Sequence, residues 1–131
     1  MTDRELVHLA LEARKQAYAP YSHFAVGAAL LCQDGRVFTG CNVENSAYGS
    51  TICAERTALV KAVSEGCTTG WTTIAIAGSG SDACWPCGAC RQMLYEFAPN
   101  LRVLAARWDG TFESALLSQL LPHGFGPESL Q

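Results

Sequence analysis

Charged residues are scarce in this chain, and long apolar runs are missing from it. Only 16% of its 131 residues are charged and the formal net charge is −3, so no basic stripe is available for a nucleic-acid backbone. No stretch approaches the roughly 18 apolar residues of a membrane span, and residues 1–5 lack the pattern of a secretory signal. We therefore expect a cytoplasmic protein that acts on a small molecule and binds neither nucleic acid nor membrane.

Apolar residues and cysteines are what the chain has in quantity. Apolar residues make up 49% of it, which is enough for a packed core, and the surplus hints at subunit contacts. The length predicts a single domain over residues 1–131. The seven cysteines are an odd number in a chain without a visible signal. This indicates reduced thiols, and clustered reduced thiols bind metal more often than they pair.

The apolar pattern predicts alternating helices and strands. Helices are expected at residues 3–18, 53–65, 87–97 and 113–121, and strands at 24–31, 36–41, 72–77 and 101–106. The first two strands flank an Asp34-Gly35 turn, and residues 42–51 form a polar loop. Because strands joined through helices run parallel, we predict an α/β fold of three layers, α/β/α, with a mixed sheet in the middle.

Two short motifs carry the chemistry: Cys53-Ala54-Glu55 and Pro86-Cys87-Gly88-Ala89-Cys90. Three thiolates can hold a zinc ion at three corners and leave the fourth open to water, which is the arrangement of a catalytic rather than a structural zinc. Glu55 would be the acid and base that moves protons at the open corner. Two helix starts meeting at the metal would stabilise the thiolates through their free N–H groups.

Two conditions follow from this arrangement. Cys53 and Glu55 would lie about 200° apart on a regular helix, so Cys53 must occupy an irregular first position. Three thiolates on zinc leave a net charge of −1, which weakens the pull on bound water. Arg56 is the leading candidate to offset this charge by hydrogen-bonding a ligand sulfur, and Arg91 is the second.

The motifs resemble those of a known family, the small homotetrameric zinc-dependent cytidine deaminases. The similarity runs from Pro20-Tyr21-Ser22-His23-Phe24 to Phe125 and includes Asn42-Val43-Glu44-Asn45, which narrows it to free nucleosides. Cys-Ala-Glu with Pro-Cys-x-x-Cys marks zinc-dependent deaminases in general. The resemblance implies a five-stranded mixed sheet, one zinc ion per subunit, and a homotetramer with shared active sites.

The resemblance also implies an activity and a set of substrate contacts. The activity is hydrolytic deamination of cytidine and 2′-deoxycytidine to the uracil nucleosides and ammonia in pyrimidine salvage, with Glu55 as the catalytic residue. Asn42 and Glu44 would bind the sugar, chiefly its 3′-hydroxyl, and the Ala54 N–H would bind the base. The remaining implied contacts are aromatic: Phe24, with Tyr48 and Phe125 reaching a site across a subunit interface.

Three alternatives remain open at this point. Family members usually carry a small hydroxyl residue where this chain has Trp85, and Cys84-Trp85-Pro86-Cys87 could be a redox pair. A fourth ligand, such as Cys84, His23 or Cys41, would make the site a non-catalytic structural zinc module. A deaminase of a cytosine-containing nucleoside antibiotic would share the cysteine motifs but is disfavoured by residues 42–45.

Overall fold

The structure, a computed structural model, describes residues 1–130. Its elements, in chain order, are α1 (Asp3–Arg14), β1 (Gly27–Cys32), β2 (Val37–Cys41), η1 (Tyr48–Ser50), α2 (Ala54–Ser64), β3 (Trp71–Ala77), α3 (Gly88–Phe97), β4 (Arg102–Ala106), β5 (Phe112–Leu116), α4 (Leu117–Leu120) and η2 (Pro127–Leu130).

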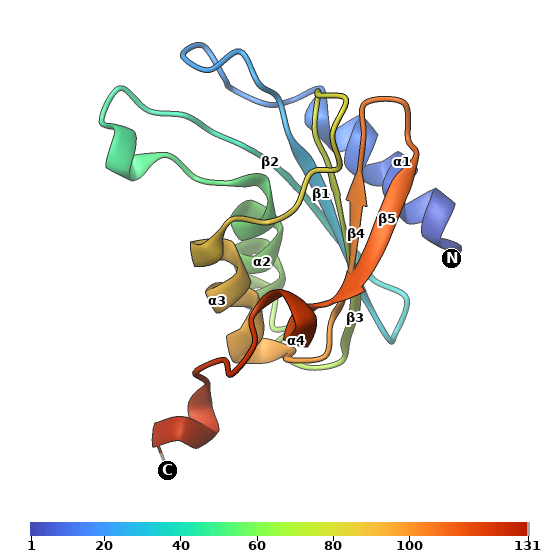
Figure 1. The fold of residues 1–131 in the computed structure, drawn as a ribbon, viewed down its shortest axis with the longest axis vertical. Helices are drawn as coiled ribbons and strands as arrows, with labels where there is room; N and C mark the ends of the chain where they lie inside the picture. Colours follow the sequence, from blue (N-terminus) through green and yellow to red (C-terminus); the bar gives the residue numbers. More distant parts are fainter. Residues whose placement is uncertain (131) are drawn as a thin grey trace.

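The five strands form one mixed sheet in the order β2-β1-β3-β4-β5. Strand β1 runs antiparallel to both β2 and β3, β3 and β4 are parallel, and β5 returns antiparallel to β4. Helix α3 provides the crossover between the parallel pair. Helix α1 covers one face of the sheet, and α2 and α3 lie on the other (Figure 1). The predicted three-layer arrangement with a mixed five-stranded sheet is confirmed.

The predicted helix at residues 113–121 is wrong. Residues Phe112–Leu116 are strand β5, and only Leu117–Leu120 are helical. The turn at Asp109-Gly110 returns the chain beside β4, where the backbone groups of this segment pair with an edge that would otherwise be open. The other predicted boundaries differ less from the structure. The first helix ends at Arg14 rather than at residue 18, and β1 begins at Gly27 rather than at residue 24.

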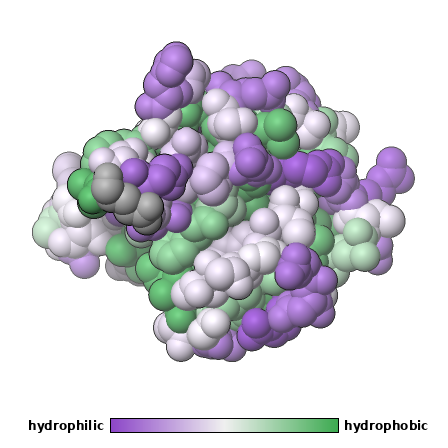
Figure 2. Space-filling model, turned by 90° about the horizontal axis from the view of Figure 1, so that it is seen from below, coloured by the Kyte–Doolittle hydropathy of each residue, from purple (hydrophilic) through white to green (hydrophobic). Residues whose placement is uncertain are grey.

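The described surface is mixed in character. Among residues 1–130 no helix has both the length and the apolar composition needed to cross a bilayer. Seen from below, apolar surface lies between polar residues (Figure 2). The exposed apolar side chains of the C-terminal segment include Phe125 and Leu130, and a second exposed set lies in the loops that precede α2.

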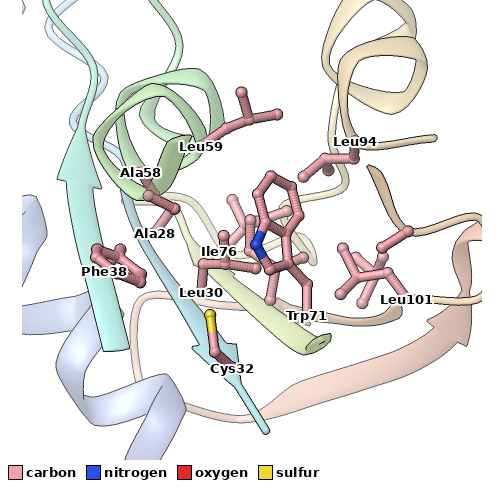
Figure 3. Packing of buried hydrophobic residues seen from close by; sticks show 14 of the residues in the cluster. Ala28, Leu30, Cys32, Phe38, Ala58, Leu59, Trp71, Ile76, Leu94 and Leu101 are labelled. Atoms are coloured by element: carbon pink, nitrogen blue, oxygen red, sulfur yellow. The ribbon is translucent and has the colours of Figure 1, made fainter. Parts of the chain in front are cut away.

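The core has a different character on each face of the sheet. Side chains alternate along β3, so Ile74 and Ile76 pack towards α2 and α3, whereas Ala75 and Ala77 face α1. The first side is filled by large residues such as Leu30, Trp71, Leu94 and Leu101 (Figure 3). Burying each of these large side chains contributes roughly 1.5–3 kcal/mol. On the second side small residues let α1 approach closely.

Helix α1 begins at a capping box. The Thr2 hydroxyl accepts a hydrogen bond from the Glu5 N–H at 3.1 Å, and the Glu5 carboxylate accepts one from the Thr2 N–H at 2.8 Å. Two otherwise unpaired N–H groups are satisfied in this way. The Arg102 guanidinium also binds the Asp3 carboxylate, which ties the start of α1 to the start of β4.

One glycine sets the position of α2 over the sheet. A Cβ atom on Gly40 of β2 would lie 2.6 Å from the Ala58 nitrogen and 2.7 Å from the Ala54 oxygen. The backbone of α2 therefore rests directly on β2, and no residue with a side chain would allow this approach. The start of α2, which carries Cys53 and Glu55, is held in place by this contact.

Candidate active site

The starts of two helices meet at a cluster of three cysteines. Cys53 is the N-cap of α2 and Cys87 is the N-cap of α3; both have extended backbones, with φ/ψ of −73/154 and −67/169. Neither side chain caps its own helix, so both sulfurs are free for another partner. Cys90, in the first turn of α3, is fully buried. The irregular first position required of Cys53 is therefore present.

The three Sγ atoms lie within 4.8 Å of one another, and the Cys87 and Cys90 sulfurs are 3.3 Å apart. Zn–S bonds of about 2.3 Å in tetrahedral geometry separate sulfurs by about 3.8 Å, so small side-chain adjustments would accommodate the ion. Within residues 1–130 no further histidine, cysteine or carboxylate joins this cluster. The donor set thus fits a soft metal ion with one position left open.

Glu55 lies beside the sulfurs and is only 6% exposed. Burial raises the pKa of its carboxyl group, and negative charge on Cys53 adds to the rise, while hydrogen bonding to the backbone opposes it. A buried carboxyl group with a raised pKa can hold a proton and pass it on, which suits proton transfer at an adjacent reacting centre.

The positive charge at the cluster comes from Arg56. Its Nη2 atom donates to the Cys53 sulfur at 3.6 Å and to the Thr51 carbonyl at 3.1 Å. Hydrogen bonding from Cys90, followed by the Arg56 guanidinium, lowers the pKa of the Cys53 thiol to about 5 against the effect of burial. The second candidate, Arg91, points elsewhere, because it donates to the Pro86 and Leu120 carbonyls at 2.7 and 2.8 Å.

A pocket of about 220 Å³ opens over this cluster, and we call it the cysteine pocket. Its lining residues are Val26, Asn42, Thr51, Ile52, Cys53, Ala54, Glu55, Cys84, Trp85 and Cys87. Two larger hollows, of about 440 and 450 Å³, lie along α1 and contain no cysteine. Because the reactive groups converge only in the cysteine pocket, it is the candidate site despite its smaller volume.

Of the predicted substrate contacts, Asn42 and Ala54 line the cysteine pocket. The Asn42 side chain accepts a hydrogen bond from the Val26 N–H at 2.9 Å and donates to the Phe24 carbonyl at 2.8 Å. It thereby fixes the approach of the chain to β1. Ala54 is the first residue of α2, so its N–H has no acceptor within the helix.

Glu44 and Tyr48 lie in a neighbouring hollow that shares Thr51 with the cysteine pocket. The Glu44 carboxylate accepts hydrogen bonds from the N–H groups of Tyr21 and Ser22 at 3.0 and 3.1 Å, and from the Ser22 hydroxyl. Those bonds hold the pKa of Glu44 below its ordinary value. The Tyr48 ring is 77% exposed.

The structure does not bring Phe24 and Phe125 into the cysteine pocket. The Phe24 ring is 42% exposed and lies over Gly78 and Gly80, and Phe125 is 56% exposed. Within one chain, therefore, the predicted aromatic contacts are dispersed around the site rather than gathered in it.

Three lining residues had no role in the sequence-based analysis: Val26, Thr51 and Ile52. Thr51 and Ile52 directly precede Cys53, so their position next to the motif was the signal that could have found them. Cys84 stays outside the sulfur cluster, which disfavours its pairing with Cys87 as a redox couple. Burial raises the pKa of the Cys84 thiol to about 11, with the charges of Glu55 and Cys53 adding to the effect.

An α/β fold with this cysteine pocket can be compared with known proteins. Residues 1–106 match the family described as "Cytidine and deoxycytidylate deaminase zinc-binding region". The chain belongs to this family.

Individual relatives extend the similarity over nearly the whole chain. It is 44% identical over 131 residues to a cytidine deaminase of Sporosarcina psychrophila, with 99% of this chain and 96% of the relative covered. It is 45% identical over 130 residues to a cytidine deaminase of Halalkalibacterium halodurans, with 98% of each covered. The crystal structure of cytidine deaminase from Burkholderia pseudomallei has a TM-score of 0.92 and 46% identity, covering 95% of this chain and 100% of that one.

Proposed function

We propose that this protein catalyses the hydrolytic deamination of cytidine and 2′-deoxycytidine, releasing ammonia and the corresponding uracil nucleoside in pyrimidine salvage. The observation that carries the proposal is the convergence of three cysteine sulfurs and a buried glutamate at two helix starts. The identity of 44–45% to cytidine deaminases over the full length supports it.

Cys53, Cys87 and Cys90 would hold one zinc ion per subunit. Zinc supplies a Lewis acid that lowers the pKa of a bound water to about 7. Arg56 offsets part of the negative charge of the three thiolates through its contact with the Cys53 sulfur. Helix starts contribute further positive potential, because Cys53 and Cys87 are the N-caps of α2 and α3 and the first N–H groups of a helix have no acceptor within it.

Glu55 acts as the proton carrier of the reaction. It accepts a proton from the attacking water, delivers it to N3 of the pyrimidine ring, and then helps to protonate the amino group that leaves from C4. Its burial keeps bulk water away from these transfers. The Ala54 N–H, which has no acceptor within α2, orients the base.

The sugar is bound by Asn42, which lines the cysteine pocket, and by Glu44, which lines the neighbouring hollow. A carboxylate at this place repels a 5′-phosphate, so the enzyme prefers nucleosides to nucleotides. Phe24, which lies outside the cysteine pocket beside Gly78 and Gly80 in a single chain, would contact the base from the edge of the site.

Tyr48 and Phe125 act across subunit interfaces in a homotetramer with shared active sites. This assembly is supported by the exposure of both rings and by a set of exposed apolar side chains near the site, namely Tyr18, Tyr21, Val43, Tyr48 and Ile52. Association would bury these side chains and complete the wall of each site.

The test is the Glu55→Gln variant assayed with cytidine by ultraviolet absorbance and ammonia release. Glutamine keeps the shape of the side chain but cannot carry the proton, so we expect about one zinc per subunit and a loss of nearly all turnover. Glu65→Gln, at the exposed far end of α2, is the matched control and retains activity. Normal activity of the Glu55 variant would refute the catalytic assignment, and normal activity of metal-free protein would refute the metal site.

A further inference from the structure

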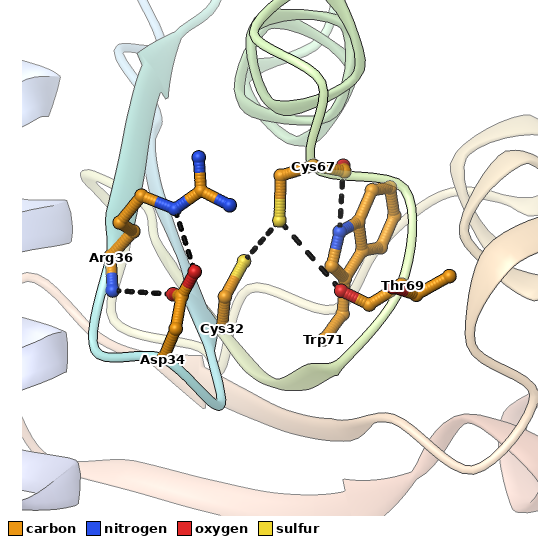
Figure 4. Close-up of polar contacts among 6 residues, drawn as sticks. All are labelled: Cys32, Asp34, Arg36, Cys67, Thr69 and Trp71. Atoms are coloured by element: carbon orange, nitrogen blue, oxygen red, sulfur yellow. Dashed lines mark hydrogen bonds and ion pairs between the residues drawn. The ribbon is translucent and has the colours of Figure 1, made fainter.

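A second pair of cysteines lies away from the cysteine pocket, at the opposite end of α2. Cys32 is the last residue of β1, and Cys67 lies in the connection between α2 and β3, 35 residues further along. Their Sγ atoms are 2.9 Å apart, and both thiols are free (Figure 4). An S–S bond measures about 2.05 Å, so small rotations of the two side chains would close the gap.

The surrounding contacts hold the two cysteines in this position. Trp71 lies opposite Cys32 in the pairing of β1 with β3, and its indole N–H donates to the Cys67 carbonyl at 3.1 Å. The Trp71 ring packs against Phe97 with centroids 4.8 Å apart. The Cys67 sulfur also contacts the Thr69 carbonyl at 3.8 Å. Since the backbone on both sides is fixed, the pair is oriented before any bond forms.

The chain segments that follow Cys32 and flank Cys67 are exposed, although the two cysteines themselves are buried. Cys32 and Cys67 are 2% and 3% exposed, but Cys67 is the one buried residue between positions 64 and 69, and the 33–36 turn after Cys32 is exposed. Local opening of such a surface connection costs far less than global unfolding. Such local opening admits a molecule as small as hydrogen peroxide to the two sulfurs.

We propose that Cys32 and Cys67 are an oxidative modification site, at which hydrogen peroxide converts the two thiols into a disulfide. The Cys67 sulfur takes one oxygen atom from the peroxide and becomes a sulfenic acid, while one water is released. The Cys32 sulfur then attacks the Cys67 sulfur, the S–S bond forms, and the hydroxyl group leaves with the Cys32 proton as a second water. Two thiols are oxidised by two electrons, and one peroxide is reduced.

The order of the two steps follows from the surroundings of Cys32. Burial raises the pKa of the Cys32 thiol to about 12, and its hydrogen bond with Cys67 adds to the rise. The Asp34 carboxylate acts in the same direction, and the Arg36 guanidinium opposes it. Since peroxide reacts with thiolates, Cys32 is a poor first target, and the sulfur on the surface connection reacts first.

The disulfide would tie the end of β1 to the end of α2. It closes a loop of about 35 residues, which restricts the unfolded chain and raises the Tm by an amount on the order of 10 °C. Cys53 and Glu55 lie at the other end of α2, so turnover of the cross-linked protein stays close to that of the reduced protein.

The experiment treats the zinc-loaded enzyme with equimolar hydrogen peroxide, alkylates the remaining thiols, and maps the peptides by mass spectrometry. We expect one peptide pair joined through Cys32 and Cys67, a higher Tm, and reversal of both by dithiothreitol. Cys67→Ser should lack the cross-link and the Tm rise, and Cys41→Ala should behave like the unsubstituted protein.

Recovery of both cysteines as alkylated thiols, or as separate sulfinic acids, would refute the proposal. So would an equal peroxide-induced Tm rise in the Cys67→Ser variant. Peptide mapping of the unsubstituted protein decides the question even if that variant does not fold.

Discussion

Replacing Gly40 by alanine tests whether the contact between β2 and α2 positions the reactive groups. The added Cβ would lie 2.6 Å from the Ala58 nitrogen, 2.7 Å from the Ala54 oxygen and 2.8 Å from the Thr57 Cβ. Two of these neighbours are backbone atoms of α2, which cannot rotate away. All three distances are about 0.6 to 0.8 Å shorter than an ordinary van der Waals contact of 3.4 Å. The helix must therefore move off the sheet by a similar amount.

The expected magnitude follows from that displacement. Overpacking of this kind lowers the free energy of unfolding by about 1–3 kcal/mol. Alanine also restricts the unfolded chain more than glycine does, and this offsets less than about 1 kcal/mol of the loss. The net effect is a Tm lower by roughly 3–8 °C. Because Cys53 and Glu55 move with the start of α2, kcat/KM for cytidine should fall about 10- to 100-fold.

Differential scanning calorimetry, zinc analysis and steady-state kinetics on Gly40→Ala measure these effects. Gly49→Ala is the control for stability, because its Cβ would meet nothing within 4 Å. If Gly40→Ala matched the unsubstituted protein in both Tm and kcat/KM, the direct seating of α2 on β2 would be wrong.

Three further changes test individual contacts. Arg56→Gln removes the positive charge beside the Cys53 sulfur, so zinc affinity measured against a competing chelator should fall about 10- to 100-fold, and an unchanged affinity would contradict the charge argument. Asn42→Ala leaves two backbone groups near β1 unpaired and should lower stability by about 1–3 kcal/mol while raising KM; a KM change at constant Tm would disprove the bracing role. The Arg102 guanidinium lowers the pKa of Asp3, so the ion pair stabilises the fold above the ordinary carboxyl pKa and this contribution disappears as pH falls through the lowered value. Asp3→Asn should therefore reduce stability at pH 7 by less than about 1 kcal/mol, since both side chains are partly exposed, and should match the unsubstituted protein near pH 2; equal stability at pH 7 would show the pair to be inert.

The second helix was predictable almost to the residue, because its signals are local. The sequence indicates residues 53–65, and the structure has α2 at Ala54–Ser64 with Cys53 as the N-cap. The irregular backbone of Cys53 could also be predicted, because Cys53 and Glu55 can face the same site only if Cys53 lies at an irregular helix start. Residue spacing and metal-ligand chemistry were therefore sufficient to predict this helix and its first residue.

Strand β5 shows where such local signals fail. Leu116, Leu117 and Leu120 have the spacing of a helix face, which favours a helix when the segment is considered alone. Pairing with β4 overrides that preference, because the neighbouring strand edge satisfies the backbone groups of residues 112–116. The sequence of residues 112–116 alone does not indicate that the edge of β4 is available for pairing.

The position of Phe24 and Phe125 relative to the cysteine pocket could not be predicted from the sequence, for a different reason. Phe24 and Phe125 belong to motifs that resemble those of the deaminases, yet each ring is exposed in a single chain. A motif specifies which residue types are present and says nothing of which subunit's site they serve. Their roles at the site therefore stay predictions.

The alanine layer beneath α1 limits how this chain can diverge. Ala29, Ala75, Ala77 and Ala106 are completely enclosed, and Leu6, Val7 and Ala10 of the helix lie against this layer. A larger side chain in the sheet fits only if a side chain of α1 is replaced by a smaller one at the same time. Sequence divergence here is therefore restricted to pairs of substitutions that conserve the total volume. The opposite layer, built from bulky side chains with several rotamers, can absorb isolated changes and is freer to evolve.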